Sequence, residues 1–234
     1  MATQVQPFQH GDVEQNIRIV LGSIALEGTL NVPYGAHGVV LFAHGSGSSR
    51  FSPRNRYVAE ALRKAKLATL LIDLLTAQEE HVDKQTAEYR FDIGLLVQRL
   101  VGATDWLTQN ADTRRLHIGY FGASTGGGAA LVAAAQRPDV VKAVVSRGGR
   151  PDLAGKALNA VKAPTLLIVG GQDTQVIILN TQALAHIQSE KSLEIVPGAS
   201  HLFEEPGTLE RVAESAREWF ARHLNVQNVK ARVM

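Results

Sequence analysis

The sequence predicts an α/β fold, a doubly wound and mainly parallel sheet of eight strands with helices on both faces. Short runs of almost entirely apolar residues, such as 38–43 and 165–169, are typical of strands that a parallel sheet buries on both faces. From the third strand onward these runs alternate with helical segments, which is the pattern of a doubly wound sheet. The 234 residues, 45% of them hydrophobic, suit a single domain with a core at about 17–223.

Eight strands and six helices are expected along the chain. The strands are expected at 17–21, 24–32, 38–43, 68–73, 116–121, 140–145, 165–169 and 192–196. The helices are expected at 53–66, 87–110, from the end of a glycine-rich turn to about 137, 152–160, 174–188 and 207–223. Gly22 and Ser23 predict a hairpin at one edge, Ser52 and Pro53 predict a helix start, and Gly102 could break the second helix. The polar segment 74–86 is expected to be a surface loop.

The composition narrows the classes of partner and cofactor. Lys and Arg number 24 against 22 Asp and Glu, and the small excess predicts no nucleic-acid partner. The absence of cysteine excludes thiolate chemistry and fits a cytoplasmic location. Without an H-x-H or H-E-x-x-H cluster, no metal or other cofactor is expected. Residues 1–13 form a polar lead-in without a secretory signal, 224–234 form a polar tail, and no apolar run predicts a membrane span.

The segment 116–135 carries the most specific pattern in the sequence. An apolar run leads into the pentapeptide G-x-S-x-G at 122–126, and an Ala- and Gly-rich helical run follows. A strand, a tight turn and a helix in this order predict a nucleophile elbow, in which small neighbours let the strand and helix pass closely. Ser124 is therefore the candidate nucleophile. The alternative is a glycine-rich turn with an incidental serine.

A serine nucleophile needs a base, and an imidazole is the usual one. Of the eight histidines only His44 and His201 directly follow the carboxyl end of a predicted strand, and His201 lies in a turn of small residues after the last strand. His201 is therefore the predicted base. Asp173, which follows the strand at 165–169, is the predicted acid, with Asp152 as the alternative. Ser124, Asp173 and His201 then occur in the nucleophile, acid, base order of α/β-hydrolases.

Two further groups are candidates for contact with the substrate. The backbone N–H of Thr125 and that of Ser46, in the small-residue loop 44–49, are the predicted donors of an oxyanion hole. That loop lacks the spacing of a phosphate-binding loop, and its alternative role is a flexible connection. Arg147 and Arg150 follow the strand at 140–145 and are candidates for binding an anionic substrate. The alternative for both arginines is an ion pair with an acid such as Asp152.

Together these motifs resemble the α/β-hydrolase superfamily, and most closely its dienelactone-hydrolase-like members. The resemblance rests on HGSGSS at 44–49, YFGASTGG at 120–127, VGGQD at 169–173 and GASH at 198–201. Dienelactone hydrolases proper use a cysteine nucleophile, so a serine here implies an esterase-like enzyme. The stretch SRGGRPDLAG is also similar to hydrolase domains attached to phosphoribosyltransferase domains, and no such second domain is expected in these 234 residues.

The predicted function is a serine hydrolase that cleaves short-chain carboxylic esters or related acyl compounds through an acyl-enzyme. Its partner is a small-molecule acyl substrate, without nucleic acid or membrane, and the chain is a monomer or a homodimer. The alternatives are a non-catalytic binding domain of the same fold and a hydrolase of lactones or thioesters. The gap at 147–163 is too short for a cap domain, which predicts an open pocket for short acyl groups.

Overall fold

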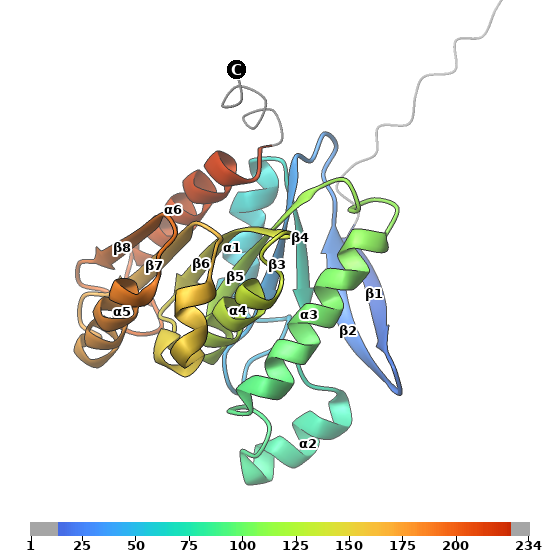
Figure 1. Ribbon diagram of the computed structural model, residues 1–234, viewed down its shortest axis with the longest axis horizontal. Helices are drawn as coiled ribbons and strands as arrows, with labels where there is room; N and C mark the ends of the chain where they lie inside the picture. Colours follow the sequence, from blue (N-terminus) through green and yellow to red (C-terminus); the bar gives the residue numbers. More distant parts are fainter. Residues whose placement is uncertain (1–13, 226–234) are drawn as a thin grey trace, which may run out of the picture.

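The computed structural model describes residues 14–225, and within them the chain forms one eight-stranded sheet of order β1-β2-β4-β3-β5-β6-β7-β8 (Figure 1). The strands are β1 Glu14–Leu21, β2 Ile24–Asn31, β3 Gly38–Ala43, β4 Leu67–Ile72, β5 His117–Ala123, β6 Val141–Arg147, β7 Thr165–Gly170 and β8 Lys191–Val196. β2 pairs antiparallel with β1 and with β4, and all other neighbours are parallel. The predicted fold class and the edge hairpin are confirmed. The expected polar lead-in at 1–13 and most of the tail lie outside the described residues.

Helices cover both faces of the sheet. They are α1 Pro53–Lys64, α2 Ala77–Thr86, α3 Ile93–Gln109, α4 Thr125–Gln136, the 3₁₀ segment η1 Pro151–Ala160, α5 Thr174–His186 and α6 Thr208–His223. In Figure 1, α3, α4, η1 and α5 lie in front of the sheet, with α1 and α6 behind it. Successive residues of a strand point to opposite faces, so Leu41 packs in the core under α3 and α4 while Phe42 packs in the core under α1 and α6.

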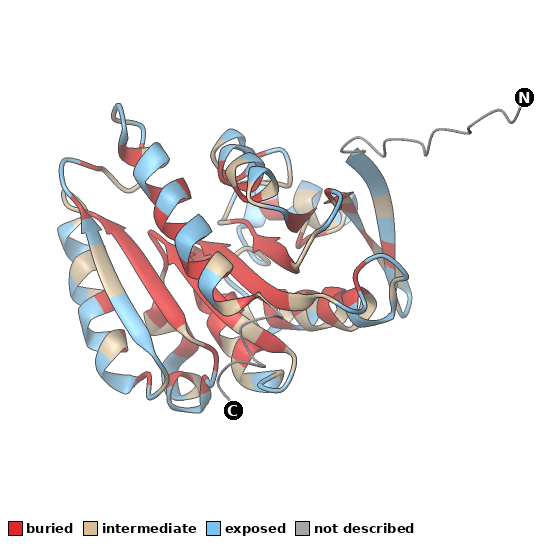
Figure 2. Ribbon diagram, turned by 90° about the horizontal axis from the view of Figure 1, so that it is seen from above, coloured by how far each residue is buried: buried red, intermediate tan, exposed pale blue. Residues whose placement is uncertain are grey.

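Burial follows the position of each strand in the sheet. β3, β4 and β7 are buried along their whole length, whereas the edge strand β8 is largely exposed (Figure 2). The apolar runs of the sequence are therefore the central strands, because helices cover both of their faces. Between β6 and β7 the chain contains only η1 and short connections, and no large cap is inserted there.

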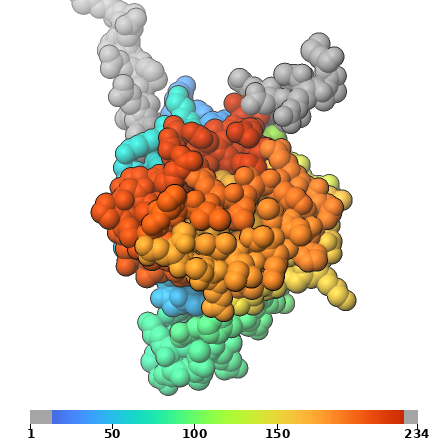
Figure 3. Space-filling model, turned by 90° about the vertical axis from the view of Figure 1, so that its left-hand side faces the viewer, coloured from blue at the N-terminus to red at the C-terminus, as the bar shows by residue number. Residues whose placement is uncertain are grey.

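The prediction of a surface loop at 74–86 was wrong, because this segment contains α2. Thr76 caps the helix by accepting from the Glu79 N–H, while Glu79 accepts from the Thr76 N–H. This capping box was present in the sequence as T-x-x-E. The helix is almost entirely polar because it lies away from the sheet, and it belongs to the green segment that projects below the body of the molecule in Figure 3.

The second predicted helix also needs correction. It was expected over 87–110, but α3 begins at Ile93 after the N-cap Asp92, whose carboxylate accepts from the Leu95 N–H. The helix continues unbroken through Gly102. A Cβ at Gly102 would lie 2.6 Å from Cδ2 of Leu21, so the glycine lets α3 pack closely on the Leu21 side chain of β1 and does not break the helix.

No helix within residues 14–225 is both long enough and apolar enough to cross a membrane.

Candidate active site

Ser124 stands between the end of β5 and the first residue of α4, in a strained backbone conformation. Its φ of 51° and ψ of −122° are rare for a residue with a side chain. The Ser124 N–H donates to the carbonyl of Arg147, and the Ser124 carbonyl accepts from the N–H groups of Gly127 and Arg150. These three bonds hold the turn and offset its strain. The conformation is the one that a nucleophile elbow requires.

The small residues around Ser124 are required by close backbone contacts. A Cβ at Gly122 would lie 2.5 Å from Cα of Gly127, and a Cβ at Gly126 would lie 2.3 Å from the carbonyl oxygen of Ala43. Both distances are too short for any side chain, and both neighbours are backbone atoms that cannot rotate away. The strand, the turn and the helix can therefore pass one another only with glycine at these positions.

His201 and Asp173 form a hydrogen-bonded pair at the same edge of the sheet. Asp173 follows β7, His201 follows β8, and Nδ1–H of His201 donates to Oδ2 of Asp173 at 2.6 Å. Asp173 is also the N-cap residue of α5 by position, but its carboxylate makes no capping bond. Gly148 also packs close to the ring, because a Cβ at that position would lie 3.5 Å from Cε1 and Nδ1 of His201. The bond to Asp173 holds the imidazole in the tautomer whose Nε2 is free to accept a proton.

Ser124 and His201 line one cavity of about 220 Å³. Its lining residues are Gly45, Ser46, Ser48, Ser52, Arg54, Asn55, Ala123, Ser124, Arg147, His201 and Leu202. Among the described residues no hydrogen bond joins Ser124 Oγ to the His201 ring. Such bonds are often long without substrate and shorten in the reacting complex. The arrangement can therefore support proton transfer from a serine to a histidine held by a carboxylate.

The other candidate histidine and the other candidate acid have different partners. The His44 ring is buried, with Nδ1–H donating to the Gly45 carbonyl and Nε2 accepting from the Leu74 N–H. Burial lowers the pKa of His44, which keeps the ring neutral. Its two hydrogen bonds tie the loop after β3 to the chain just after β4. Asp152 accepts two hydrogen bonds from the guanidinium of Arg150, at 2.9 and 2.8 Å, and within residues 14–225 it forms no hydrogen bond or ion pair with a histidine.

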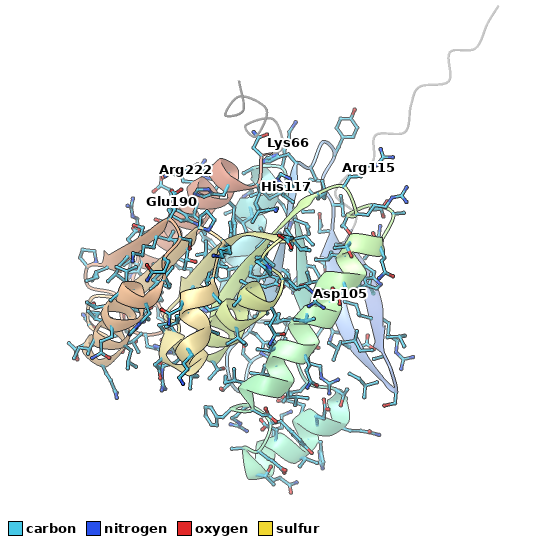
Figure 4. All side chains as sticks on the ribbon, in the orientation of Figure 1. Lys66, Asp105, Arg115, His117, Glu190 and Arg222 are labelled. Carbon is cyan, nitrogen blue, oxygen red and sulfur yellow. The ribbon has the colours of Figure 1, made fainter. Side chains whose placement is uncertain are left out.

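The amino end of β5 shows which edge of the sheet carries the site. His117 begins β5, seven residues before Ser124, and Figure 4 places it near Lys66 at the upper end of the sheet. Ser124, Asp173 and His201 all follow carboxyl ends of strands, at the opposite edge. In open α/β sheets this is the edge where ligands bind.

The two predicted oxyanion residues lie side by side. Thr125 is the first residue of α4, so its backbone N–H belongs to a helix N-terminus. Ser46 Oγ lies 3.0 Å from Thr125 Oγ1 and also donates to the carbonyl of Arg90. A Cβ at Gly45 would lie 3.0 Å from Cβ of Ser124, so the loop after β3 packs directly against the elbow. This packing places Ser46 in the lining of the same cavity as Ser124.

Two groups of residues at the site were missed by sequence reasoning. Asp83 of α2 is 1% exposed and accepts from the N–H groups of Tyr89 and Arg90 and from Arg90 Nε–H. It thereby holds the segment whose carbonyl binds Ser46. The only available signal was the capping box that starts α2. Arg54 and Asn55 of α1 also line the cavity, and nothing in the sequence distinguished them from other polar residues of a helix.

The sequence model of the dienelactone hydrolase family matches residues 30–228. The chain belongs to the dienelactone hydrolase family. The resemblance expected from its motifs is confirmed, and the family is one of hydrolases with an α/β-hydrolase fold. A crystal structure of a dienelactone hydrolase from Anabaena variabilis is 65% identical, covers 92% of this chain and 100% of its own, and superposes with a TM-score of 0.91.

A more distant structure shares the fold, and a longer protein contains a region similar to this chain. Est1E from Butyrivibrio proteoclasticus is 17% identical, covers 88% of this chain and 98% of its own with a TM-score of 0.74, and shares the fold. A Mycobacterium tuberculosis protein with the provisional name phosphoribosyl transferase is 57% identical over 211 residues, which are 90% of this chain and 47% of that protein. The chain thus spans about half the length of the curated relatives that it matches.

Proposed function

We propose that this member of the dienelactone hydrolase family is a serine hydrolase that cleaves short-chain carboxylic esters or related acyl compounds through an acyl-enzyme. The observation that carries the proposal is the shared cavity: Ser124, in the strained turn, opens into the same space as His201, whose Nδ1 is bound to Asp173. A strained serine beside an oriented imidazole is the arrangement that acyl transfer requires.

The residues act in a defined order. Ser124 Oγ attacks the acyl carbon while His201 Nε2 accepts the serine proton, and Asp173 stabilises the imidazolium. The N–H groups of Thr125 and Ser46 bind the oxyanion of the tetrahedral intermediate. The intermediate expels the alcohol, which takes the proton from His201, and leaves the acyl-enzyme. Water then attacks the acyl-enzyme with His201 as base, releasing the acid and restoring Ser124.

Lactones and thioesters are alternative substrates of the same chemistry. The Anabaena structure bears the name dienelactone hydrolase, which favours a lactone among these alternatives. A non-catalytic binding domain is the alternative from another class. The transferase name belongs to a protein in which the matched region makes up 47% of the length. The cavity that Ser124 and His201 line supports acyl transfer to water instead.

Labelling by a fluorophosphonate probe tests the proposal, together with a hydrolysis screen of acetyl to butyryl esters, lactones and thioesters. We expect the wild-type protein to be labelled at Ser124 and to hydrolyse members of the screen, and Ser124→Ala to do neither. Ser189→Ala is the matched control, because that hydroxyl donates to the Ala163 carbonyl and does not line the cavity. Absence of both labelling and turnover in the wild-type protein would favour the binding domain.

A further inference from the structure

Arg147 is a buried cation without an acid partner. It ends β6 beside Ala123, the residue before Ser124, and it is 7% exposed. Its Nη2–H donates to Oδ1 of Asn55 at 3.3 Å, and its guanidinium lies 5.7 Å from the centre of the Phe203 ring. No carboxylate among residues 14–225 forms an ion pair with it. Buried charges are normally paired, so a guanidinium left in this state is a candidate for binding an anion.

A second guanidinium lies at the same cavity. Arg54 lines it from the first turn of α1, and burial together with the positive charge of Arg54 lowers the pKa of Arg147 to about 10. The partner of Arg54 is Glu204, at 3.3 Å, whose side chain is 63% exposed. The Nε of Arg54 is buried and has no partner. Two guanidinium groups are thus opposed by one solvated carboxylate, which can move away at little cost.

The remaining lining of the cavity also suits an anion. No aspartate or glutamate is among its lining residues, and the hydroxyl-bearing Ser48 and Ser52 are. Ser52 is the N-cap of α1, a helix of 12 residues whose first turn contains no acidic residue. The amino end of this helix therefore adds partial positive charge to the side of the cavity that carries Arg54.

We propose that Arg54 and Arg147 form a subsite for an anionic oxygen group of the substrate, a phosphate or a carboxylate, beside the scissile acyl group. The subsite rests on the proposed function, because it places the anion on the molecule that Ser124 attacks. Asn55 orients the Arg147 guanidinium, which can then bind two oxygens at once. A phosphate dianion balances both guanidinium charges, whereas a carboxylate balances one. We therefore expect phosphate to bind more tightly than carboxylate.

Arg150 provides a contrast within the same loop. Its guanidinium is occupied by both carboxylate oxygens of Asp152, and it does not line the cavity. Of the two arginines that the sequence nominated for substrate binding, only Arg147 remains in this proposal, and Arg54 takes the place of Arg150.

Binding can be measured without turnover in a Ser124→Ala background. The ligands are three aryl acetates that differ in one substituent: 4-acetoxyphenyl phosphate, 4-acetoxybenzoate and the neutral 4-acetoxyanisole. Calorimetry is expected to show the phosphate binding at least about tenfold more tightly than the neutral ligand, the effect of one or more charged hydrogen bonds. Adding Arg54→Gln should reduce this ratio by about tenfold. Arg56→Gln, on the same helix but outside the cavity, should leave it unchanged.

The outcomes separate the subsite from the proposed function. Equal affinity for all three ligands, or a ratio that Arg54→Gln and Arg56→Gln change equally, would overturn the subsite. Tighter binding of the carboxylate than of the phosphate would support the subsite and identify a carboxylate as its occupant. A different result would overturn the proposed function and leave the subsite standing: the wild-type protein hydrolyses none of the three acetates, while their affinities for the Ser124→Ala protein still differ.

Discussion

The two sides of the Ser124 cavity are held in place by different forces. On one side, Ser124, Asp173 and His201 follow β5, β7 and β8, whose positions are set by the sheet and by glycine contacts that no side chain fits. On the other side, Ser46 is held by the Thr125 hydroxyl and by the carbonyl of Arg90, and Arg90 is in turn held by its ion pair with Asp83. A change to one of these three side chains should remove chemistry without unfolding the protein, whereas a change to Asp83 or Arg90 should move Ser46.

The largest expected effect is that of Ser124→Ala on the first side. The hydroxyl opens into a cavity, so its loss leaves no new void in the core. We expect the variant to fold and to lose up to about 10⁶-fold in kcat, which is the cost of losing the nucleophile in a well-measured triad. Ester hydrolysis and a melting curve check both parts. Near wild-type turnover by folded Ser124→Ala would assign the chemistry to another residue.

The second effect distinguishes the two candidate acids. Asp173→Asn should lower kcat by as much as about 10⁴-fold, because an amide favours the wrong imidazole tautomer. Asp152→Asn should stay near wild type, since that carboxylate binds Arg150 and not His201. Steady-state kinetics of the two variants with one acetyl ester provide the comparison. The reverse ranking would move the acid to the loop after β6.

The first side could be predicted from sequence because its geometry requires particular residue types at particular positions. Close backbone contacts demand glycine at 122 and 126, and parallel strands bring their carboxyl ends to one edge, so Ser124, Asp173 and His201 could be grouped before any geometry was known. The second side could not be predicted, because the sequence does not show whether an aspartate such as Asp83 is buried or solvated. Arg54 was missed for the same reason, since only packing distinguishes it from Arg56.

A third and smaller effect tests the second side directly. Asp83→Asn keeps the shape of the side chain but loses the charge that binds Arg90, so the fold should become less stable at this point. We expect faster hydrogen exchange across α2 and a kcat lowered by about tenfold, because a loosened Ser46 would weaken one oxyanion donor. Glu80→Gln is the control on the same helix, where a partly exposed pair with Lys84 at 3.8 Å contributes less than about 1 kcal/mol.

The pH dependence of the Asp83 pair has a definite sign. Burial acts to raise the pKa of Asp83, but hydrogen bonds from the backbone of Arg90 and Tyr89 and from the Arg90 guanidinium outweigh it and lower the pKa below 3.8. The carboxylate therefore stabilises the fold above its unfolded pKa, and this contribution disappears as the pH falls through the folded pKa. The stability difference between wild type and Asp83→Asn should shrink below pH 3.8. A difference that is constant from pH 7 to pH 3 would contradict a charged Asp83.

The smallest expected effect is that of the length of the acyl group. It depends on whether either side of the cavity has apolar side chains that a longer chain could contact. Ala123 and the half-exposed Leu202 are the apolar side chains among the lining residues, and the cavity is about 220 Å³. The other candidate covers are η1, which is short, and α2, which is almost entirely polar. A long acyl chain would leave methylenes in water and forgo about 0.8 kcal/mol for each. We therefore expect kcat/KM to be highest for nitrophenyl esters from acetate to butyrate, with no further rise for longer chains and no activation by micelles.

If kcat/KM instead keeps rising beyond eight carbons, or jumps when micelles form, an apolar wall must assemble around the substrate. In that case α2, which is tied to the Ser46 loop through Asp83 and Arg90 and to α3 through Glu79 and Arg99, is the element that would have to move. Asp83→Asn should then alter the chain-length profile.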